Sequence, residues 1–174
     1  YHKSSNDNTI IECPKRNFRA ITDRIANFIY PVFESNPDYC FFNQNEKRSI
    51  VSINEALRKI PFKPDFIILH WISRFINARN IYQLRKKAKC PIIWYGMDMA
   101  PLTGGCHYSW NCTGYTKSCG NCPALYSSDS FDQSSKNLKI KDRYISKAKV
   151  SYVAPNSFTL DQASKSLLFS RGDI

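Results

Sequence analysis

Three short apolar runs interrupt a mostly polar chain: Phe66–Leu69, Pro91–Tyr95 and Val150–Ala154. The first run follows Pro64-Asp65 and is rich in isoleucine, which is typical of a strand buried on both faces of a parallel sheet. We expect the second run to form another buried strand and the third to form a third strand. The hydrophobic pattern therefore predicts a sheet of at least these strands.

Apolar residues spaced three and four positions apart predict helices before, between and after these strands. The predicted helices are Pro14–Val32, Ile53–Ile60, one that carries Phe75, Ile76, Ile81, Leu84 and Ala88, Lys136–Lys149, and one that carries Leu160, Ala163, Leu167 and Leu168. Ser52 and Glu55 have the spacing of a capping box, and Ser157 is the predicted cap of the last helix. Strands that alternate with helices indicate an α/β fold with right-handed crossovers.

One stretch, Gly104–Pro123, lacks such periodicity and holds four of the seven cysteines. Its spacing is C-H-x4-C-x6-C-x2-C, with Cys106, His107, Cys112, Cys119 and Cys122. Because the stretch is rich in glycine and poor in aliphatic residues, it has no core of its own and needs a cross-link. The Cys119-x2-Cys122 spacing is that of a zinc knuckle, which favours a metal. Two disulfides, or free buried thiols, are the alternatives.

The formal charge of +11 favours polyanionic partners, such as nucleic acid, an anionic bilayer or phosphorylated and pyrophosphate-bearing substrates. The basic residues are spread along the chain, and the one short run, Arg85–Lys89, falls where a helix is predicted to end. There is no apolar signal segment and no run of about 18 apolar residues. Together with the odd number of cysteines, this leads us to expect a reducing cytoplasm, where clustered thiols bind metal.

Candidate chemistry lies after the predicted strands, because ligands of open parallel sheets bind beyond the carboxyl ends of the strands. The first strand ends in His70-Trp71, and Asp98 follows the second. His70 is either a cleft residue or a core histidine. Asp98 is either a carboxylate in the cleft or a turn residue that accepts backbone N–H groups. Asn156-Ser157, after the third strand, is most simply a helix cap, although a helix N-terminus can also hold phosphate.

The longest motif, DMAPLTGGCHYSWNCTGYTKSCGNCPAL, runs from Asp98 to Leu125. It closely resembles the motif of a subgroup of bacterial family 4 glycosyltransferases, which build capsule, colanic-acid-like and O-antigen polysaccharides. Later segments are also similar to that family: Asp132-x-Ser134 with Lys141, and Val153–Pro155 with Ser166–Phe169. The resemblance covers about residues 61–174.

This resemblance implies a GT-B architecture, in which two Rossmann-like domains face each other across a cleft. The enzyme would transfer a sugar, with retention of configuration, from a nucleotide-sugar to a lipid-linked or oligosaccharide acceptor. Residues 1–174 would form a single acceptor-side domain, a Rossmann-like parallel sheet with helices on both faces and a cysteine-rich loop at 104–123. The donor domain would be absent, so this chain alone would be inactive. The protein would act in the cytoplasm, at the inner membrane surface, and no nucleic-acid partner is expected.

The resemblance also implies roles for individual residues. Asp98 would be the catalytic residue of the cleft, and His70 and Trp71 would form its acceptor wall. Thr103, Gly104 and Gly105 would also line the cleft. The expected ligands of a structural zinc ion are Cys106, Cys112, Cys119 and Cys122, with His107 as the alternative ligand. Four thiolates leave no open coordination position, so we expect no catalytic role for the metal.

Two alternatives to an active transferase remain open. Members of the family carry histidine immediately before the aspartate of the motif, and this chain has Met97, which suits a catalytically inactive scaffold. A zinc-dependent nucleic-acid-binding module is indicated by the charge and by Tyr108, Trp110 and Tyr115. Against the second alternative, Lys117 is the one basic residue within the loop.

Overall fold

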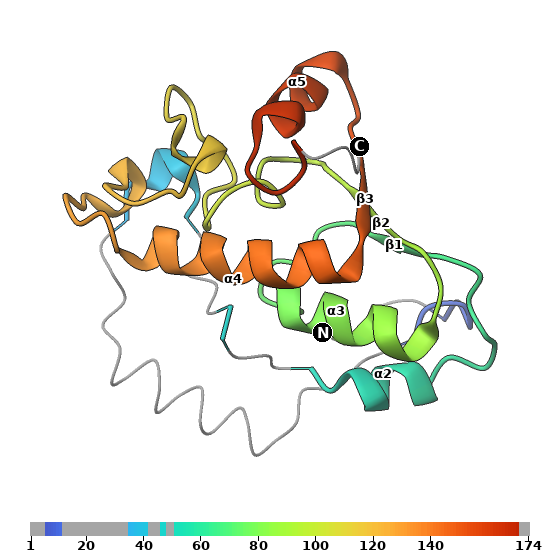
Figure 1. The fold of residues 1–174 in the computed structure, drawn as a ribbon. Coiled ribbons are helices and arrows are strands. Elements are labelled where there is room, and N and C mark those ends of the chain that lie inside the picture. Colours follow the sequence, from blue (N-terminus) through green and yellow to red (C-terminus); the bar gives the residue numbers. More distant parts are fainter. Residues whose placement is uncertain (1–5, 12–34, 42–45, 48–50, 171–174) are drawn as a thin grey trace.

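The structure is a computed structural model that describes residues 6–11, 35–41, 46–47 and 51–170 (Figure 1). Its elements are η1 (Pro37–Tyr39), α2 (Ile53–Arg58), β1 (Ile67–Leu69), α3 (Ala78–Ala88), β2 (Ile92–Tyr95), η2 (Gly114–Thr116), η3 (Pro123–Leu125), α4 (Gln133–Ala148), β3 (Val150–Val153) and α5 (Ser157–Lys165). The predicted helix Pro14–Val32 lies outside the described residues.

The three strands form one parallel sheet in the order β1-β2-β3. Ile92 of β2 is aligned with Ile67 of β1 on one side and with Val150 of β3 on the other. Because strand order follows chain order, two crossovers of the same hand place α3 and α4 on the same face of the sheet. These helices lie side by side (Figure 1). The predicted α/β class with a parallel sheet is confirmed.

One face of this sheet is buried, and the other is partly exposed. The buried face consists of Leu69, Ile92, Trp94, Val150 and Tyr152, which share a core with Ile81 and Leu84 of α3 and with Leu138, Ile145 and Ala148 of α4. On the opposite face, Ile68 is 46% exposed and Val153 is 43% exposed. The prediction that the first strand is buried on both faces is therefore wrong for the described residues, because α3 and α4 cover a single face.

Side-chain caps explain where the last two helices begin. α4 starts at Gln133 rather than Lys136, because the side chain of Asp132 accepts a hydrogen bond from a backbone N–H of the first turn. α5 is capped in the same way by Asn156, and the prediction that Ser157 is its cap is wrong. Ser157 is instead the first helical residue.

The earlier helices are shorter than predicted. α2 ends at Arg58, and its N-cap Ser52 makes no side-chain capping bond, so the predicted capping box is not formed. α3 begins at Ala78, and Phe75-Ile76 belong to the turn before it. In the part of the chain that the structure describes, no helix combines the length and the apolar character needed to cross a membrane.

The buried side of α4 holds the backbone of the cysteine-rich loop through polar side chains. They are Asp132, Ser134, Asn137 and Lys141. The Lys141 ammonium donates to the carbonyl oxygens of Ala100 at 2.8 Å and Thr103 at 2.9 Å. The Asn137 amide donates to the carbonyl of Gly104 at 3.0 Å. The backbone N–H groups of Gly120 and Cys122 donate to Ser134 Oγ and Asp132 Oδ2, each at 3.0 Å.

Lys141 also neutralises a buried carboxylate. Its Nζ lies 3.8 Å from Oε1 of Glu46, a residue that is 1% exposed. Oε2 of Glu46 accepts the backbone N–H of Ala78 at 2.9 Å, at the first turn of α3. Burial raises the pKa of Glu46, whereas Lys141 and this N–H act in the opposite direction. The pair therefore connects α3, α4 and the loop.

We predict that Lys141→Met destabilises the protein by about 3–5 kcal/mol, because it leaves Glu46 buried without a cation and removes the donor to two carbonyls. The free energy of unfolding, from denaturant titration, measures this loss. Glu46→Gln combined with Lys141→Met should lose less than Lys141→Met alone. Lys147→Met, at an exposed position on the same helix, serves as the control. Equal losses from the two lysine variants would contradict the prediction.

Candidate functional site

A pocket at the carboxyl ends of β1 and β2 gathers several predicted cleft residues, and we call it the sheet-end pocket. Its lining includes His70, Trp71, Ser73, Tyr95, Met97, Asp98 and His107. His70 and Trp71 directly follow β1, and Asp98 comes three residues after the end of β2. Because neighbouring parallel strands end at the same edge, residues far apart in the sequence meet here.

A hydrogen-bonded chain of three side chains lies in this pocket. Nδ1 of His107 is 2.7 Å from Oδ2 of Asp98, and Nε2 of His107 is 3.0 Å from Oγ of Ser73. A carboxylate can only accept, so Nδ1 carries the hydrogen when Asp98 is ionised, and Nε2 of the neutral ring accepts from Ser73. His107 is 2% exposed and Ser73 is 5% exposed. This order of serine, imidazole and carboxylate can move a proton from Ser73 to His107.

Trp71 covers the imidazole of His107. The two ring centroids are 4.5 Å apart with an interplanar angle of 37°. Trp71 is itself 56% exposed, so it presents an apolar surface at the mouth of the pocket. The ring of His70 packs against Tyr95 beside it, with centroids 5.5 Å apart. The pocket thus combines aromatic walls with a few polar groups, as small-molecule sites do.

Asp98 performs the turn role that the sequence left open as an alternative. Its Oδ1 accepts the backbone N–H of Ala100 at 2.7 Å, while Oδ2 contacts His107. Both oxygens of the carboxylate are therefore engaged inside the protein. The geometry gives Asp98 the task of orienting His107.

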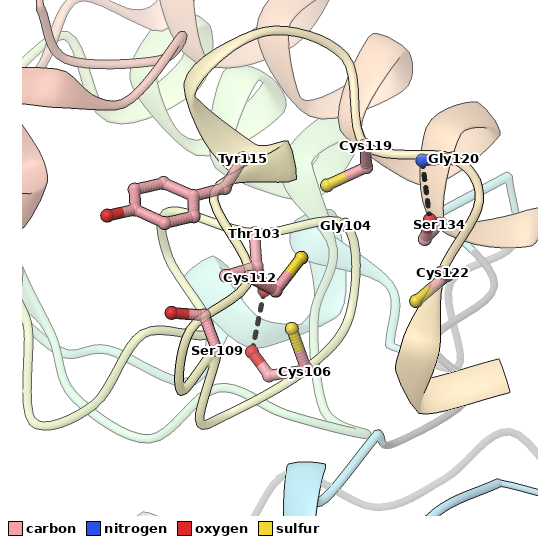
Figure 2. Close-up of a pocket in the computed structure, with 10 residues that line it drawn as sticks. All are labelled: Thr103, Gly104, Cys106, Ser109, Cys112, Tyr115, Cys119, Gly120, Cys122 and Ser134. Atoms are coloured by element: carbon pink, nitrogen blue, oxygen red, sulfur yellow. Dashed lines mark hydrogen bonds between the residues drawn. The ribbon is translucent and has the colours of Figure 1, made fainter. Parts of the chain in front are cut away.

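The four cysteines of the motif line a second pocket, which we call the cysteine pocket. Figure 2 shows Cys106, Cys112, Cys119 and Cys122 around it, with their sulfur atoms on separate segments of the loop. All four are free thiols in the structure. Their sulfur atoms are the ligand type that structural zinc sites use.

Thr103, Gly104 and Gly105 do not reach the sheet-end pocket. Thr103 and Gly104 line the cysteine pocket, and the Thr103 hydroxyl donates to the carbonyl of Cys106 at 2.6 Å. A Cβ atom on Gly104 would overlap the backbone carbonyl of Ser134, so α4 can pack here only against glycine. Gly105 is buried against the ring of Phe41. These residues shape the wall between the pockets.

Burial makes the thiolate form of Cys106, Cys119 and Cys122 costly. Burial, with smaller contributions from the neighbouring thiols of Cys122 and Cys112, raises the pKa of Cys106 to about 11, and the Thr103 hydroxyl and Lys141 oppose this shift. Burial likewise raises the pKa of Cys119 to about 12. The pKa of Cys122 is raised for the same reason, although Ser134 and two backbone amides oppose the shift. A bound cation would offset this cost, because coordination favours the thiolate.

Strained backbone surrounds the last two cysteines. Cys119, Gly120 and Asn121 have φ values of 55°, 89° and 46°, which place three consecutive residues in the left-handed region. The backbone N–H groups that follow are all bound, including that of Asn121, which donates to Asp129 at 2.8 Å. A turn of this kind persists only when its surroundings hold it, and here Asp129, Asp132 and Ser134 hold it through hydrogen bonds.

The four thiols fit a zinc ion in type and number, and they surround a common space. Within the described ranges, no three His, Cys, Asp or Glu side chains are already arranged to hold a metal ion. Binding would therefore draw the sulfur atoms inward. His107 faces the other pocket with both ring nitrogens engaged, so this arrangement does not present it as a fourth ligand.

Sequence analysis missed two residues, Ser73 and Glu46, and only partly anticipated the exposure of the aromatic residues in the loop. Ser73 and Glu46 belong to no motif, because a single serine or glutamate in an irregular segment produces no periodic pattern. Of the three aromatic residues that suggested nucleic-acid binding, Tyr108 and Trp110 are exposed, but Tyr115 is buried.

Comparison of the chain with protein-family models, curated proteins and solved structures finds no match. Its function is therefore inferred from the site and from the motif.

We predict that the metal-free protein takes up one zinc ion and releases roughly one proton per coordinating thiol, because a thiol must lose its proton to bind zinc and burial raises the pKa values of Cys106, Cys119 and Cys122. An indicator-dye titration with zinc measures the protons. Zinc should also protect Cys106 and Cys119 from iodoacetamide above pH 10, where their thiolates begin to form. Cys90→Ala, outside the loop, should change neither result. Stoichiometric uptake without proton release, or no uptake, would contradict the prediction.

Proposed function

We propose that this chain is the acceptor-side domain of a retaining glycosyltransferase with GT-B architecture. In this proposal the sheet is part of a Rossmann-like domain, and the sheet-end pocket receives a saccharide acceptor. A second domain of the same kind binds the nucleotide-sugar. The observation that carries the proposal is the meeting of His70, Trp71 and Asp98, which the family resemblance assigns to the cleft, in a single pocket.

The chemistry of this pocket suits a sugar. The indole of Trp71 offers an apolar surface for the C–H face of a pyranose ring, as aromatic side chains do for amphipathic ligands. His70 and Ser73 supply hydrogen-bonding groups beside it. Asp98 fixes the ring of His107, and the ring of His107 packs against that of Trp71. Each residue thus contributes binding or orientation.

The cysteine-rich loop forms the framework of this site. Lys141 and Asn137 hold the segment that leads into the loop, and its first residue, against α4 through the carbonyls of Ala100, Thr103 and Gly104. Zinc bound to the four thiols would supply a structural cross-link for the rest of the loop. No step of the transfer depends on the metal.

Two further properties bear on the reaction. Met97 is 60% exposed and lines the pocket where members of the resembled family usually carry histidine, so any contact that this histidine would make with the transferred sugar has to come from another group. The charge of +11 suits a lipid-pyrophosphate acceptor at the anionic cytoplasmic face of a membrane.

We expect the protein that contains this chain to release nucleoside diphosphate when it is given a panel of nucleotide-sugars and lipid-linked saccharides. Trp71→Ala should raise KM for the acceptor about tenfold, because roughly 1.4 kcal/mol of binding is lost, with a smaller change in kcat. Trp110→Ala, an exposed tryptophan outside the pocket, is the control. Absence of turnover with every donor, or equal effects of both variants, would overturn the proposal.

A second candidate function is nucleophilic catalysis by Ser73, and the Ser73–His107–Asp98 chain is the observation that favours it. Ser73 Oγ would attack an ester carbon while His107 takes its proton and then returns it to the leaving alcohol. Water would release the acyl group in the same manner. The small exposure of Ser73 restricts this activity to small esters.

A fluorophosphonate probe tests the second candidate directly, since Ser73 would displace fluoride and retain the phosphonyl group. We expect, if Ser73 is a nucleophile, labelling that mass spectrometry maps to Ser73 and that His107→Gln slows by about 100-fold. Ser109→Ala removes another buried serine and should leave labelling unchanged. An unlabelled Ser73 would exclude this function.

A further inference from the structure

Two consecutive residues face different pockets. The side chain of Cys106 lines the cysteine pocket (Figure 2), and that of His107 lines the sheet-end pocket. The two pockets are therefore adjacent through a single peptide unit. Cys106 and His107 are consecutive in the sequence, so no flexible residue lies between them.

The backbone around this peptide is held from both sides. Cys106 forms an antiparallel bridge with Phe41, and the His107 N–H donates to the carbonyl of Tyr39 at 3.1 Å. The carbonyl of His107 accepts the N–H of Met99 at 3.1 Å. Thr103 binds the carbonyl of Cys106. Because Cys106 and His107 share this peptide, a rearrangement of the loop that moves the backbone of Cys106 moves the backbone of His107 as well.

The imidazole in turn contacts both strand ends that build the sheet-end pocket. Ser73 and Trp71 come from the segment after β1, and Asp98 comes from the segment after β2. His107 touches all three through two hydrogen bonds and one ring contact. His107 thus connects the segment after β1 with the segment after β2.

We propose that His107 is the positioning residue through which the cysteine pocket shapes the sheet-end pocket. While the four thiols surround a common space, as they do in the structure, His107 is seated between Asp98 and Ser73 and supports Trp71. When the loop opens and the thiols separate, the imidazole leaves this position and Trp71 loses its support. The identity of the ligand in the sheet-end pocket rests on the proposed function, but the coupling between the pockets does not.

The chain has three tryptophans, which makes fluorine NMR of protein labelled with 5-fluorotryptophan a direct test. Trp71 reports on the sheet-end pocket, Trp110 on the loop, and Trp94, which is 4% exposed, on the core. Trp71→Phe and Trp110→Phe assign the three signals. The zinc-loaded protein is compared with its Cys119→Ser and Cys90→Ala variants.

Cys119→Ser should shift or broaden the Trp71 signal while the Trp94 signal stays in place. Cys90→Ala, which removes a buried thiol outside the loop, should leave all three signals unchanged. His107→Ala should change the Trp71 signal as Cys119→Ser does, yet keep wild-type zinc content and thiol protection. Together these results would show that the cysteine pocket acts on Trp71 through His107.

Three results would overturn the proposal. The Trp71 signal could stay unchanged in Cys119→Ser, which would show that the two pockets are independent. The Trp94 signal could move together with that of Trp71, which would mean that the loop supports the whole core. His107→Ala could release zinc, which would make His107 part of the cysteine pocket. None of these readouts uses a sugar or turnover, so they stand apart from failure of the transferase assay.

Discussion

A row of buried polar side chains on α4 is the constraint on which the rest of the site depends. Asp132, Ser134, Asn137 and Lys141 provide hydrogen-bonding partners for a loop that has no regular structure beyond short turns. Buried backbone groups without partners would each cost free energy comparable to a lost hydrogen bond. The helix therefore supplies hydrogen-bonding partners for the backbone of this loop, as a neighbouring strand does within a sheet.

Of these four side chains, Lys141 is the one whose burial costs the most free energy. A buried ammonium is tolerated only when charge and hydrogen bonds offset its desolvation, and here Glu46 and two carbonyls do so. In return, one side chain fixes the start of the loop relative to α4, and Glu46 extends this to the first turn of α3. Apolar residues of the same volume could fill the space, but they could not hold carbonyl groups at defined positions.

This arrangement places the cysteine pocket next to the sheet-end pocket, and different kinds of side chain line each. The cysteine pocket is lined by four thiols, a ligand type that favours a soft cation, and burial raises the pKa values of Cys106 and Cys119. The sheet-end pocket is lined by aromatic rings and hydrogen-bonding groups, which suits a neutral polar ligand. The peptide between Cys106 and His107 belongs to both, and we regard it as the link between the order of the loop and the shape of the ligand site.

The sequence by itself determined the α/β class, the three strands and the clustering of cysteines, because periodicity, apolar runs and ligand spacing are local properties of the chain. It misjudged the burial of β1 and the cap of α5, since exposure and capping depend on what packs nearby. Only the tertiary structure decided that His107 faces Asp98 and Ser73 rather than the cysteines. Ser73 and His107 are 34 positions apart, and such contacts follow from strand order and helix packing, which no local pattern records.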